Sequence, residues 1–176
     1  VGKTLTPKNG KPSKGDIVLV LKSDKQLGAE GYRLTIGDVT TITASTVEGL
    51  VWGTRTILQL TEQNRSTGFV LPKGSTMDSP NYKLRGFMMD CGRKFIPMPY
   101  LRSLVKIMSY YKMNTLQIHL NDNGFKQFFG GDWAKTPAAF RLECDTYPGL
   151  TAKDGSYTKA EFIELQKLAG RYGVNI

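Results

Sequence analysis

The chain has 176 residues, 40% of them hydrophobic, which is typical of a soluble globular protein with one or two domains. No stretch approaches the roughly 18 consecutive apolar residues of a membrane-spanning helix, so we expect no membrane span. The net charge of +9 suits a nucleic-acid or acidic-glycan partner, but the cations are spread along the chain without a basic stripe, and we expect no nucleic-acid partner.

The first part of the chain predicts a short lead-in followed by three strands. Residues 1–15 are rich in Lys, Pro, Gly and Ser and do not resemble a signal peptide. Ile17–Leu21 is apolar, Tyr32–Ile36 alternates between apolar and polar residues, and Thr40–Ala44 is β-branched. The short turn between the last two strands predicts a hairpin.

A helix and a strand are expected next. Apolar residues recur at helical spacing over Val47–Gln59, and Trp52 falls beside that stripe, where packing in a core or between domains is its expected role. Phe69–Leu71 predicts a short strand. The Ser-, Gly- and Pro-rich stretch Gly74–Pro80 is the best candidate for a linker.

The centre of the chain predicts a strand–helix–strand unit. Leu84–Asp90 is apolar without alternation, as expected of a parallel strand that is covered on both faces. Pro97 and Pro99 then favour a helix start. A helical face follows, made of Leu101, Leu104, Val105, Met108 and Tyr111. Thr115–Leu120 is the second strand.

Polar side chains cluster just after both of these strands. Asp90 and Arg93 follow the first strand, and His119 and the run Asn121–Asn123 lie at the end of the second. Ligands bind at the carboxyl ends of parallel strands in α/β folds. The sequence therefore predicts a binding site at this edge.

A long irregular segment, residues 121–157, follows the second strand. It is rich in aromatic residues set among glycines and polar residues, namely Phe125, Phe128, Phe129, Trp133, Phe140 and Tyr147. Such a composition is too aromatic for disorder. A carbohydrate-binding loop and a loop that packs its own rings as a small satellite core explain it equally well.

The C-terminal part of the chain predicts a capped helix and then another strand. Thr158 and Glu161 form a capping-box pattern, and Gly173 is placed to end the helix. Val174–Ile176 begins a strand. The order strand–helix–strand–loop–helix–strand is typical of a parallel barrel, which needs eight such units and about 250 residues.

The predicted fold class is therefore an α+β domain over residues 1–80, followed at residues 81–176 by the first βα units of a (β/α)8 TIM barrel. The cysteines, Cys91 and Cys144, have no metal-ligand spacing, and the chain has a single histidine. We expect no metal site and no cofactor. A disulfide between the two cysteines stays open at this point.

Two motifs in the second half resemble glycoside hydrolase family 20, the β-N-acetylhexosaminidases. The family's first barrel strand carries the pattern R-G-x-x-x-D-x-x-R, found here as RGFMMDCGR from Arg85 to Arg93. Its second strand ends in an H-x-D-D type motif, here HLNDN from His119 to Asn123. The leading α+β unit and the last helix match the family's layout as well, so the resemblance covers nearly the whole chain.

The resemblance implies removal of terminal N-acetylglucosamine or N-acetylgalactosamine from glycans with retention of configuration. The acetamido oxygen of the substrate attacks the anomeric carbon, so no enzyme carboxylate forms a covalent bond. An Asp that orients the acetamide and an adjacent Glu acid lie on the family's fourth barrel strand, beyond Ile176.

The resemblance also gives roles to three residues. Arg85 matches an arginine that hydrogen-bonds hydroxyls of the terminal sugar. Asp122 matches an aspartate that supports the acid through a histidine outside this chain, and His119 matches a histidine that lines the same pocket. Taken without the resemblance, Arg85 is better explained as an ion-pair partner of Asp90, and His119 as a hydrogen-bonded core histidine. Asn123 stands where many relatives have a second acid, which alters neighbouring pKa values or marks another linkage preference.

These expectations describe part of an exo-acting enzyme for N-acetylhexosamine-containing glycans, secreted, periplasmic or at the cell surface, and inactive by itself. The alternative is a non-catalytic carbohydrate-binding or interaction module that uses the aromatic segment. Because an incomplete barrel exposes apolar surface and open strand edges, we also expect the isolated chain to self-associate.

Overall fold

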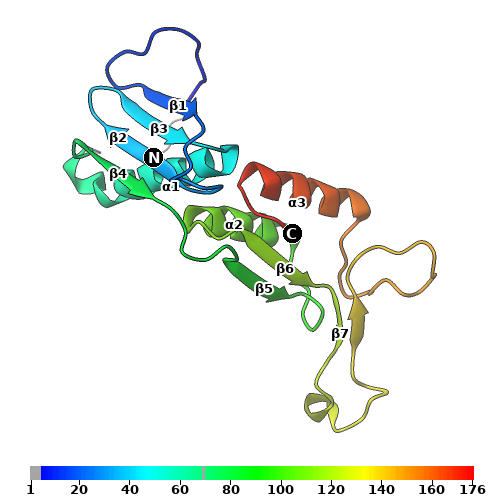
Figure 1. The fold of residues 1–176 in the computed structure, drawn as a ribbon. Coiled ribbons are helices and arrows are strands. Elements are labelled where there is room, and N and C mark those ends of the chain that lie inside the picture. The colour runs from blue at the N-terminus through cyan, green and yellow to red at the C-terminus, as the bar shows by residue number, and fades with distance from the viewer. Residues whose placement is uncertain (1–4, 69) are drawn as a thin grey trace. The chain divides into compact units, whose positions relative to one another are not determined.

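The computed structural model describes residues 5–68 and 70–176. The chain divides into two compact units, Val1–Lys83 and Leu84–Ile176, which are described separately below (Figure 1). Among the described residues, no helix combines the length and the apolar character needed to cross a bilayer.

The first unit is built on a four-stranded sheet with the order β1-β3-β2-β4. Its strands are β1 (Ile17–Leu21), β2 (Tyr32–Ile36), β3 (Thr40–Ala44) and β4 (Gly74–Asp78). Strands β2 and β3 pair antiparallel, which confirms the predicted hairpin, and β1 pairs parallel with β3.

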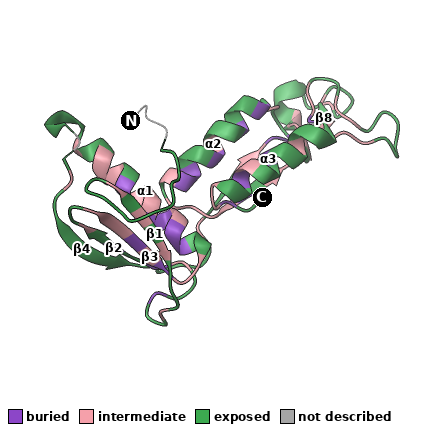
Figure 2. Ribbon diagram, turned by 90° about the horizontal axis from the view of Figure 1, so that it is seen from above, coloured by how far each residue is buried: buried purple, intermediate pink, exposed green. Residues whose placement is uncertain are grey.

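Strand β4 lies where the sequence predicted a linker, so that prediction is wrong. It is an edge strand that is exposed along its length, and four of its five residues are small or polar, with Met77 as the exception (Figure 2). Polar contacts fix it to β2: Tyr32 Oη donates to Asp78 Oδ2 at 2.7 Å, and the hydroxyls of Thr35 and Ser75 lie 3.1 Å apart. The predicted strand at 69–71 is not observed at its described positions, 70 and 71, and Phe69 lies outside the described residues.

Helix α1 (Val47–Gln63) begins where predicted and runs four residues further. The Thr46 hydroxyl accepts a hydrogen bond from the Gly49 N–H and caps its first turn. The core of this unit forms between the helix and the sheet, from Tyr32, Leu34, Ile42, Ala44, Leu50, Trp52 and Ile57. Trp52 is 2% exposed and donates from Nε1 to Glu30, which confirms its predicted core role.

The second unit contains the predicted strand–helix–strand unit. Strands β5 (Gly86–Asp90) and β6 (Thr115–His119) pair parallel and are joined by α2 (Met98–Tyr110). Asn175 forms a parallel bridge with Thr115 on the other edge of β6, as expected for the start of a further strand.

The two helices of this unit, α2 and α3 (Lys159–Arg171), pack against each other (Figure 1). Their buried faces share a core with β6 and its neighbours, made of Cys91, Met98, Leu101, Val105, Met108, Leu116, Tyr157, Leu165, Ala169 and Val174. The capping box of Thr158 and Glu161 is present at the start of α3, and Gly173 adopts φ +74° after its end. Both features confirm the predicted helix boundaries.

The sequence predicted that β5 is covered on both faces, but the structure leaves parts of it exposed. Phe87 is 44% exposed and Met88 is 52% exposed, although their apolar side chains suit burial. Among the described residues, only β6 pairs with β5. One edge of this apolar strand is therefore open, and each of its faces is partly exposed, because neighbouring strand residues point to opposite faces.

The long segment after β6 contains a small antiparallel pair, β7 (Asn121–Asn123) and β8 (Ala138–Phe140), and a short 3-10 turn at Lys126–Phe129. The connection between β7 and β8 extends away from the rest of the unit (Figure 1). Its rings are not packed as a satellite core, because Phe128 is 76% and Trp133 is 60% exposed.

Candidate functional site

The parallel register of β5 and β6 brings two motif segments to one edge of the sheet. Asp90, the last residue of β5, lies opposite His119, the last residue of β6. The Cys91 N–H donates to the His119 carbonyl at 3.0 Å, which extends the pairing past the strand ends. Strand β7 begins two residues later, at Asn121, so the residues after both strands meet at this edge.

Arg93 links the two strand ends through carboxylates. Its Nη1 donates to Asp90 Oδ2 at 2.9 Å, and its Nη2 lies 2.7 Å from Asp122 Oδ2. The Arg93 N–H also donates to Asp90 Oδ1 at 3.0 Å. Its guanidinium lies 4.7 Å from the centre of the Phe125 ring, which places an aromatic face beside the cation.

His119 shares the same carboxylate with Arg93. Its Nε2 lies 2.8 Å from Asp122 Oδ2, while Oδ1 of that carboxylate accepts the Asn123 N–H at 2.8 Å. The side chain of His119 is 36% exposed, so it is not a core histidine. The four side chains of Asp90, Arg93, His119 and Asp122 therefore form one connected cluster that solvent can reach.

These contacts favour the charged forms of Asp90, Arg93 and Asp122. The hydrogen bond with His119, then the bond from the Asn123 N–H and the nearby Arg93 charge, lower the pKa of Asp122. Burial raises the pKa of Asp90, but the hydrogen bonds and charge of Arg93 outweigh burial and lower it overall. The hydrogen bond to Asp90 raises the pKa of Arg93. Asp90, Arg93 and Asp122 are therefore held in their charged forms.

Of the three predicted site residues, His119 and Asp122 come together and Arg85 does not join them. Arg85 precedes β5, and its Nε donates to the Lys112 carbonyl at 2.7 Å while its N–H donates to Asn114 Oδ1 at 3.0 Å. Because β5 and β6 run parallel, Arg85 lies at the amino end of the pair and Asp122 beyond the carboxyl end. The prediction that both face one pocket is wrong, and the alternative pairing of Arg85 with Asp90 fails for the same reason.

Arg93 is the functional candidate that was left out of the predicted site residues. The signal for it was present, because it follows the carboxyl end of a predicted parallel strand, where ligands bind. The motif RGFMMDCGR contains an arginine at each of its ends, and only the strand direction tells them apart.

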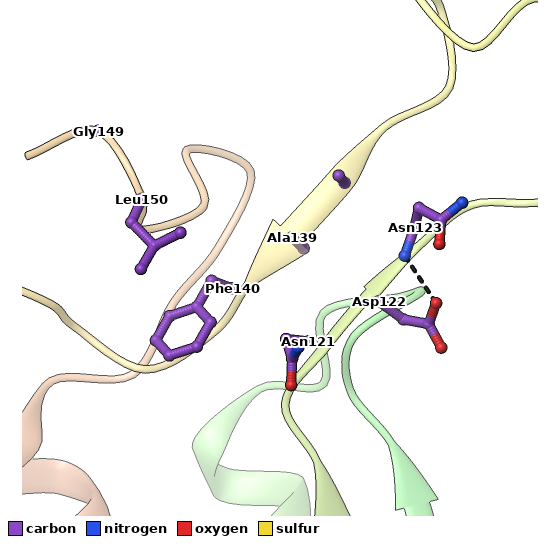
Figure 3. A pocket seen from close by; sticks show the side chains of 8 residues that line it. Asn121, Asp122, Asn123, Ala139, Phe140, Gly149 and Leu150 are labelled. Atoms are coloured by element: carbon purple, nitrogen blue, oxygen red, sulfur yellow. Dashed lines mark hydrogen bonds between the residues drawn. The ribbon is translucent and has the colours of Figure 1, made fainter. Parts of the chain in front are cut away.

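A hollow lies next to the cluster, on the β7–β8 pair (Figure 3). Its lining combines carboxamides and a carboxylate from one strand with apolar groups from the other strand and a following turn: Asn121, Asp122, Asn123, Ala138, Ala139, Phe140, Gly149 and Leu150. Figure 3 shows the Phe140 ring and the Leu150 side chain on the side opposite Asp122. A lining of both polar and apolar groups suits a ligand that has both kinds of surface.

The described residues hold no group of three or more His, Cys, Asp or Glu side chains arranged for a metal ion. The disulfide that the sequence left open does not form: Cys91 is buried and free, and Cys144 is partly buried and free.

Family models match both units of the chain. Residues 2–79 match the model described as glycosyl hydrolase family 20, domain 2, and residues 82–176 match the model described as glycosyl hydrolase family 20, catalytic domain.

Curated relatives are similar over most of this chain. A β-hexosaminidase of Akkermansia muciniphila is 35% identical over 163 residues, which are 90% of this chain and 33% of that protein. The β-hexosaminidase subunit alpha of Bos taurus is 31% identical over 76% of this chain and 23% of its own length. The chain thus spans about a third or less of the relatives that it matches.

Solved structures of β-N-acetylhexosaminidases are also similar to most of this chain, which again covers about a third of their length. A family 20 β-N-acetylhexosaminidase of Streptomyces coelicolor superposes with a TM-score of 0.74 at 27% identity, covering 93% of this chain and 33% of that one. A mutant Streptomyces plicatus β-hexosaminidase in complex with its product GlcNAc superposes with a TM-score of 0.73 at 27% identity, covering 90% and 32%. The predicted fold class, an α+β domain followed by the start of a TIM barrel, is confirmed.

Proposed function

The chain belongs to glycoside hydrolase family 20, and we propose that it supplies the leading domain and one wall of the sugar site of an exo-acting β-N-acetylhexosaminidase. The protein removes terminal N-acetylglucosamine or N-acetylgalactosamine from glycans with retention, using the acetamide of the substrate as nucleophile. The observation that carries the proposal is the cluster of Arg93, His119 and Asp122 after the first two barrel strands, where (β/α)8 enzymes bind their substrates.

Arg93 has the chemistry to hold sugar hydroxyls. A guanidinium has five N–H donors; Asp90 accepts from one terminal nitrogen of Arg93, and Asp122 forms an ion pair with the other. The remaining donors keep the fork geometry that matches two neighbouring oxygens. The side chain is 36% exposed, so a sugar can reach these donors while the two carboxylates hold the guanidinium in place.

Asp122 and His119 form one side of the site. The resemblance to the family assigns Asp122 the support of the general acid through a histidine outside this chain. The lowered pKa of Asp122 suits that role, because a supporting carboxylate must stay ionised at working pH. His119 holds one carboxylate oxygen at 2.8 Å and so fixes the orientation of Asp122.

The test compares this chain with the longest open reading frame that contains it. We expect the longer protein to hydrolyse 4-nitrophenyl N-acetyl-β-D-glucosaminide, and the 176-residue chain to leave it intact. Robust turnover by the 176-residue chain alone would contradict the assignment of the acid to another part of the protein.

A second candidate function is a carbohydrate-binding module without catalysis. The exposed rings of Phe128, Trp133 and Tyr147 favour it, since aromatic faces stack on sugars. Sugar binding measured by calorimetry separates the two functions. Loss of binding in Trp133→Ala but not in Arg93→Gln supports the module, and the opposite result supports the site described above.

The open edge of β5 and the exposed apolar side chains beside it support the expected self-association of the isolated chain. Leu84, Phe87 and Met88 are 70%, 44% and 52% exposed, and apolar strands with open edges pair with other chains. Light scattering of the 176-residue chain should detect oligomers at micromolar concentration, whereas a strictly monomeric profile contradicts this expectation.

A further inference from the structure

Arg141 is the largest buried polar residue in the described chain, and the proposed function does not use it. It is 1% exposed, although arginine is rarely buried unless it is paired. It follows β8 directly. Its position after a surface strand and before a loop gives no reason for such burial.

The guanidinium of Arg141 binds backbone carbonyls on two segments. Its Nε donates to the Cys91 carbonyl at 2.8 Å and its Nη2 to the Gly92 carbonyl at 3.1 Å. Its Nη1 donates to the Gly155 carbonyl at 2.9 Å and to Asp154 Oδ1 at 2.6 Å. Cys91 and Gly92 are the two residues that connect Asp90 to Arg93, so the contact is made with the turn that carries the sugar-site arginine.

The backbone of Arg141 is fixed to the other strand of the site. Its N–H donates to the Leu120 carbonyl at 2.9 Å, between His119 and the start of β7, and its carbonyl accepts from the Tyr157 N–H at 2.6 Å. One residue therefore ties the end of β6 by its backbone and the end of β5 by its side chain. These are the two strand ends whose separation determines whether Arg93 reaches Asp122.

Gly92 closes the same turn from the opposite side. A Cβ on Gly92 would lie 2.8 Å from the Asp122 nitrogen and 2.9 Å from the Asn121 carbonyl carbon, so the turn rests directly on the β7 backbone. Gly92 sets how closely the turn approaches β7, and Arg141 holds it there.

The carbonyl contacts of this cation, rather than its ion pair, explain its burial. Among the described residues its ion-pair partner is Asp154, whose side chain is 64% exposed, so their ion pair is screened by water. Replacing a buried ion pair by apolar residues is often neutral or stabilising. What an apolar side chain lacks is a set of donors in a rigid plane that can hold three carbonyls at once.

We propose that Arg141 is a positioning residue for the sugar site: it clamps the turn at Cys91 and Gly92 and so holds Arg93 against Asp122. The significance of this role rests on the proposed function, whereas the clamp itself is a property of this chain. Arg141 does not contact the sugar; it acts through Arg93.

The first test measures the clamp in the wild-type 176-residue chain by NMR. A hydrogen-bond scalar coupling between Arg141 Nε and the Cys91 carbonyl carbon is expected. Exchange of the Arg141 Nε–H with solvent should be slower than exchange of the same group in Arg65, whose side chain is 69% exposed. Absence of the coupling together with fast exchange overturns the proposal, without any substituted protein having to fold.

The second test uses Arg141→Lys, with Asp154→Asn as a matched control. Lysine keeps the charge but is a point donor that cannot hold three carbonyls, so Arg93 should move away from Asp122. Because His119 is the only histidine, its ring signals are unambiguous and report ionisation of the Asp122 carboxylate that they contact. The acid inflection of these signals should move to higher pH in Arg141→Lys and stay unchanged in Asp154→Asn, where the carbonyl contacts remain.

An unchanged inflection in a folded Arg141→Lys protein overturns the proposal, because a purely structural arginine leaves the His119 signals unmoved. In the longer protein, kcat/KM of Arg141→Lys should fall, by as much as roughly 100-fold for a displacement of about 1 Å. The NMR measurements contain no sugar. If wild-type His119 signals also fail to respond to N-acetylglucosamine, the proposed function of this chain fails while the clamp stands.

Discussion

Two arginines of one nine-residue motif, Arg85 and Arg93, lie at opposite ends of the β5–β6 pair and have different surroundings. At the amino end, Arg85 donates to the carbonyl of Lys112, a residue with φ +57°, and so holds a strained turn. At the carboxyl end, Arg93 is held by the carboxylates of Asp90 and Asp122. An arginine that donates to a backbone carbonyl stabilises the fold. An arginine that is held between two carboxylates keeps further N–H donors that can bind a ligand.

The difference follows from strand direction. Both strands run the same way, so a residue just before β5 lies on the stability side of the unit, and a residue just after β5 lies on the ligand side. Four experiments test this comparison, from the largest expected effect to the smallest.

Arg93→Gln should have the largest effect on sugar binding. It removes the charged donors, and hydrogen bonds to charged groups contribute about 1.5–3 kcal/mol, so affinity should fall roughly 10- to 100-fold. Titration of the 176-residue chain with N-acetylglucosamine, followed on the His119 ring signals, measures the loss. Thermal stability should change little, because the ion pairs of Arg93 are partly exposed. If the affinity for N-acetylglucosamine is unchanged, Arg93 does not belong to the site.

Arg85→Gln should show the opposite pattern. Loss of the bond to the Lys112 carbonyl should destabilise the second unit by about 1–3 kcal/mol, with sugar affinity kept in the folded fraction. Urea unfolding gives the stability and the same NMR titration gives the affinity. If Arg85→Gln lowers the affinity for N-acetylglucosamine without lowering the free energy of unfolding, Arg85 does belong to the sugar site.

Asp122→Asn should make the free energy of unfolding depend less on pH in the acid range. The pKa of Asp122 is lower in the folded chain than in the unfolded chain, so its contribution is present above the unfolded value of about 3.9 and is lost as pH falls through the folded value. Urea unfolding between pH 7 and pH 2 should show a smaller loss of stability in Asp122→Asn than in wild type. Parallel curves for the two proteins would mean that the contacts of Asp122 do not persist in solution.

Trp133→Ala should have the smallest effect. The ring is 60% exposed, and Lys126 Nζ lies 5.4 Å from its centre, a contact that solvent weakens. Stability should stay within about 0.5 kcal/mol of wild type by urea unfolding. A larger loss would mean that the aromatic segment is packed in solution, in contrast to the exposed loop described above.

Local patterns in the sequence were sufficient for most elements of the fold. The hairpin of β2 and β3, the start of α1, the capping box at Thr158 and the parallel strands all depend on residues close together in the chain. Strand β4 was missed because an edge strand needs no apolar face, so its sequence resembles a loop.

The site was predicted less completely because its geometry depends on distant contacts. The polar cluster after both strands was recognised, and His119 and Asp122 do lie together. The motif alone does not distinguish Arg85 from Arg93, because only the strand direction separates the two arginines. Arg141 gave no local signal, since its partners Cys91 and Gly92 are about 50 residues earlier in the chain.

The close approach of Gly92 to β7 has a consequence for which amino-acid changes this protein tolerates. Any larger residue at position 92 meets main-chain atoms of Asn121 and Asp122, which cannot turn aside as a flexible side chain does. In a library of all single substitutions, position 92 should therefore accept no replacement without loss of function, while neighbouring Lys94, which is exposed, accepts many. In the proposed sugar site, the position that tolerates the fewest substitutions is then occupied by glycine, a residue without a functional side chain.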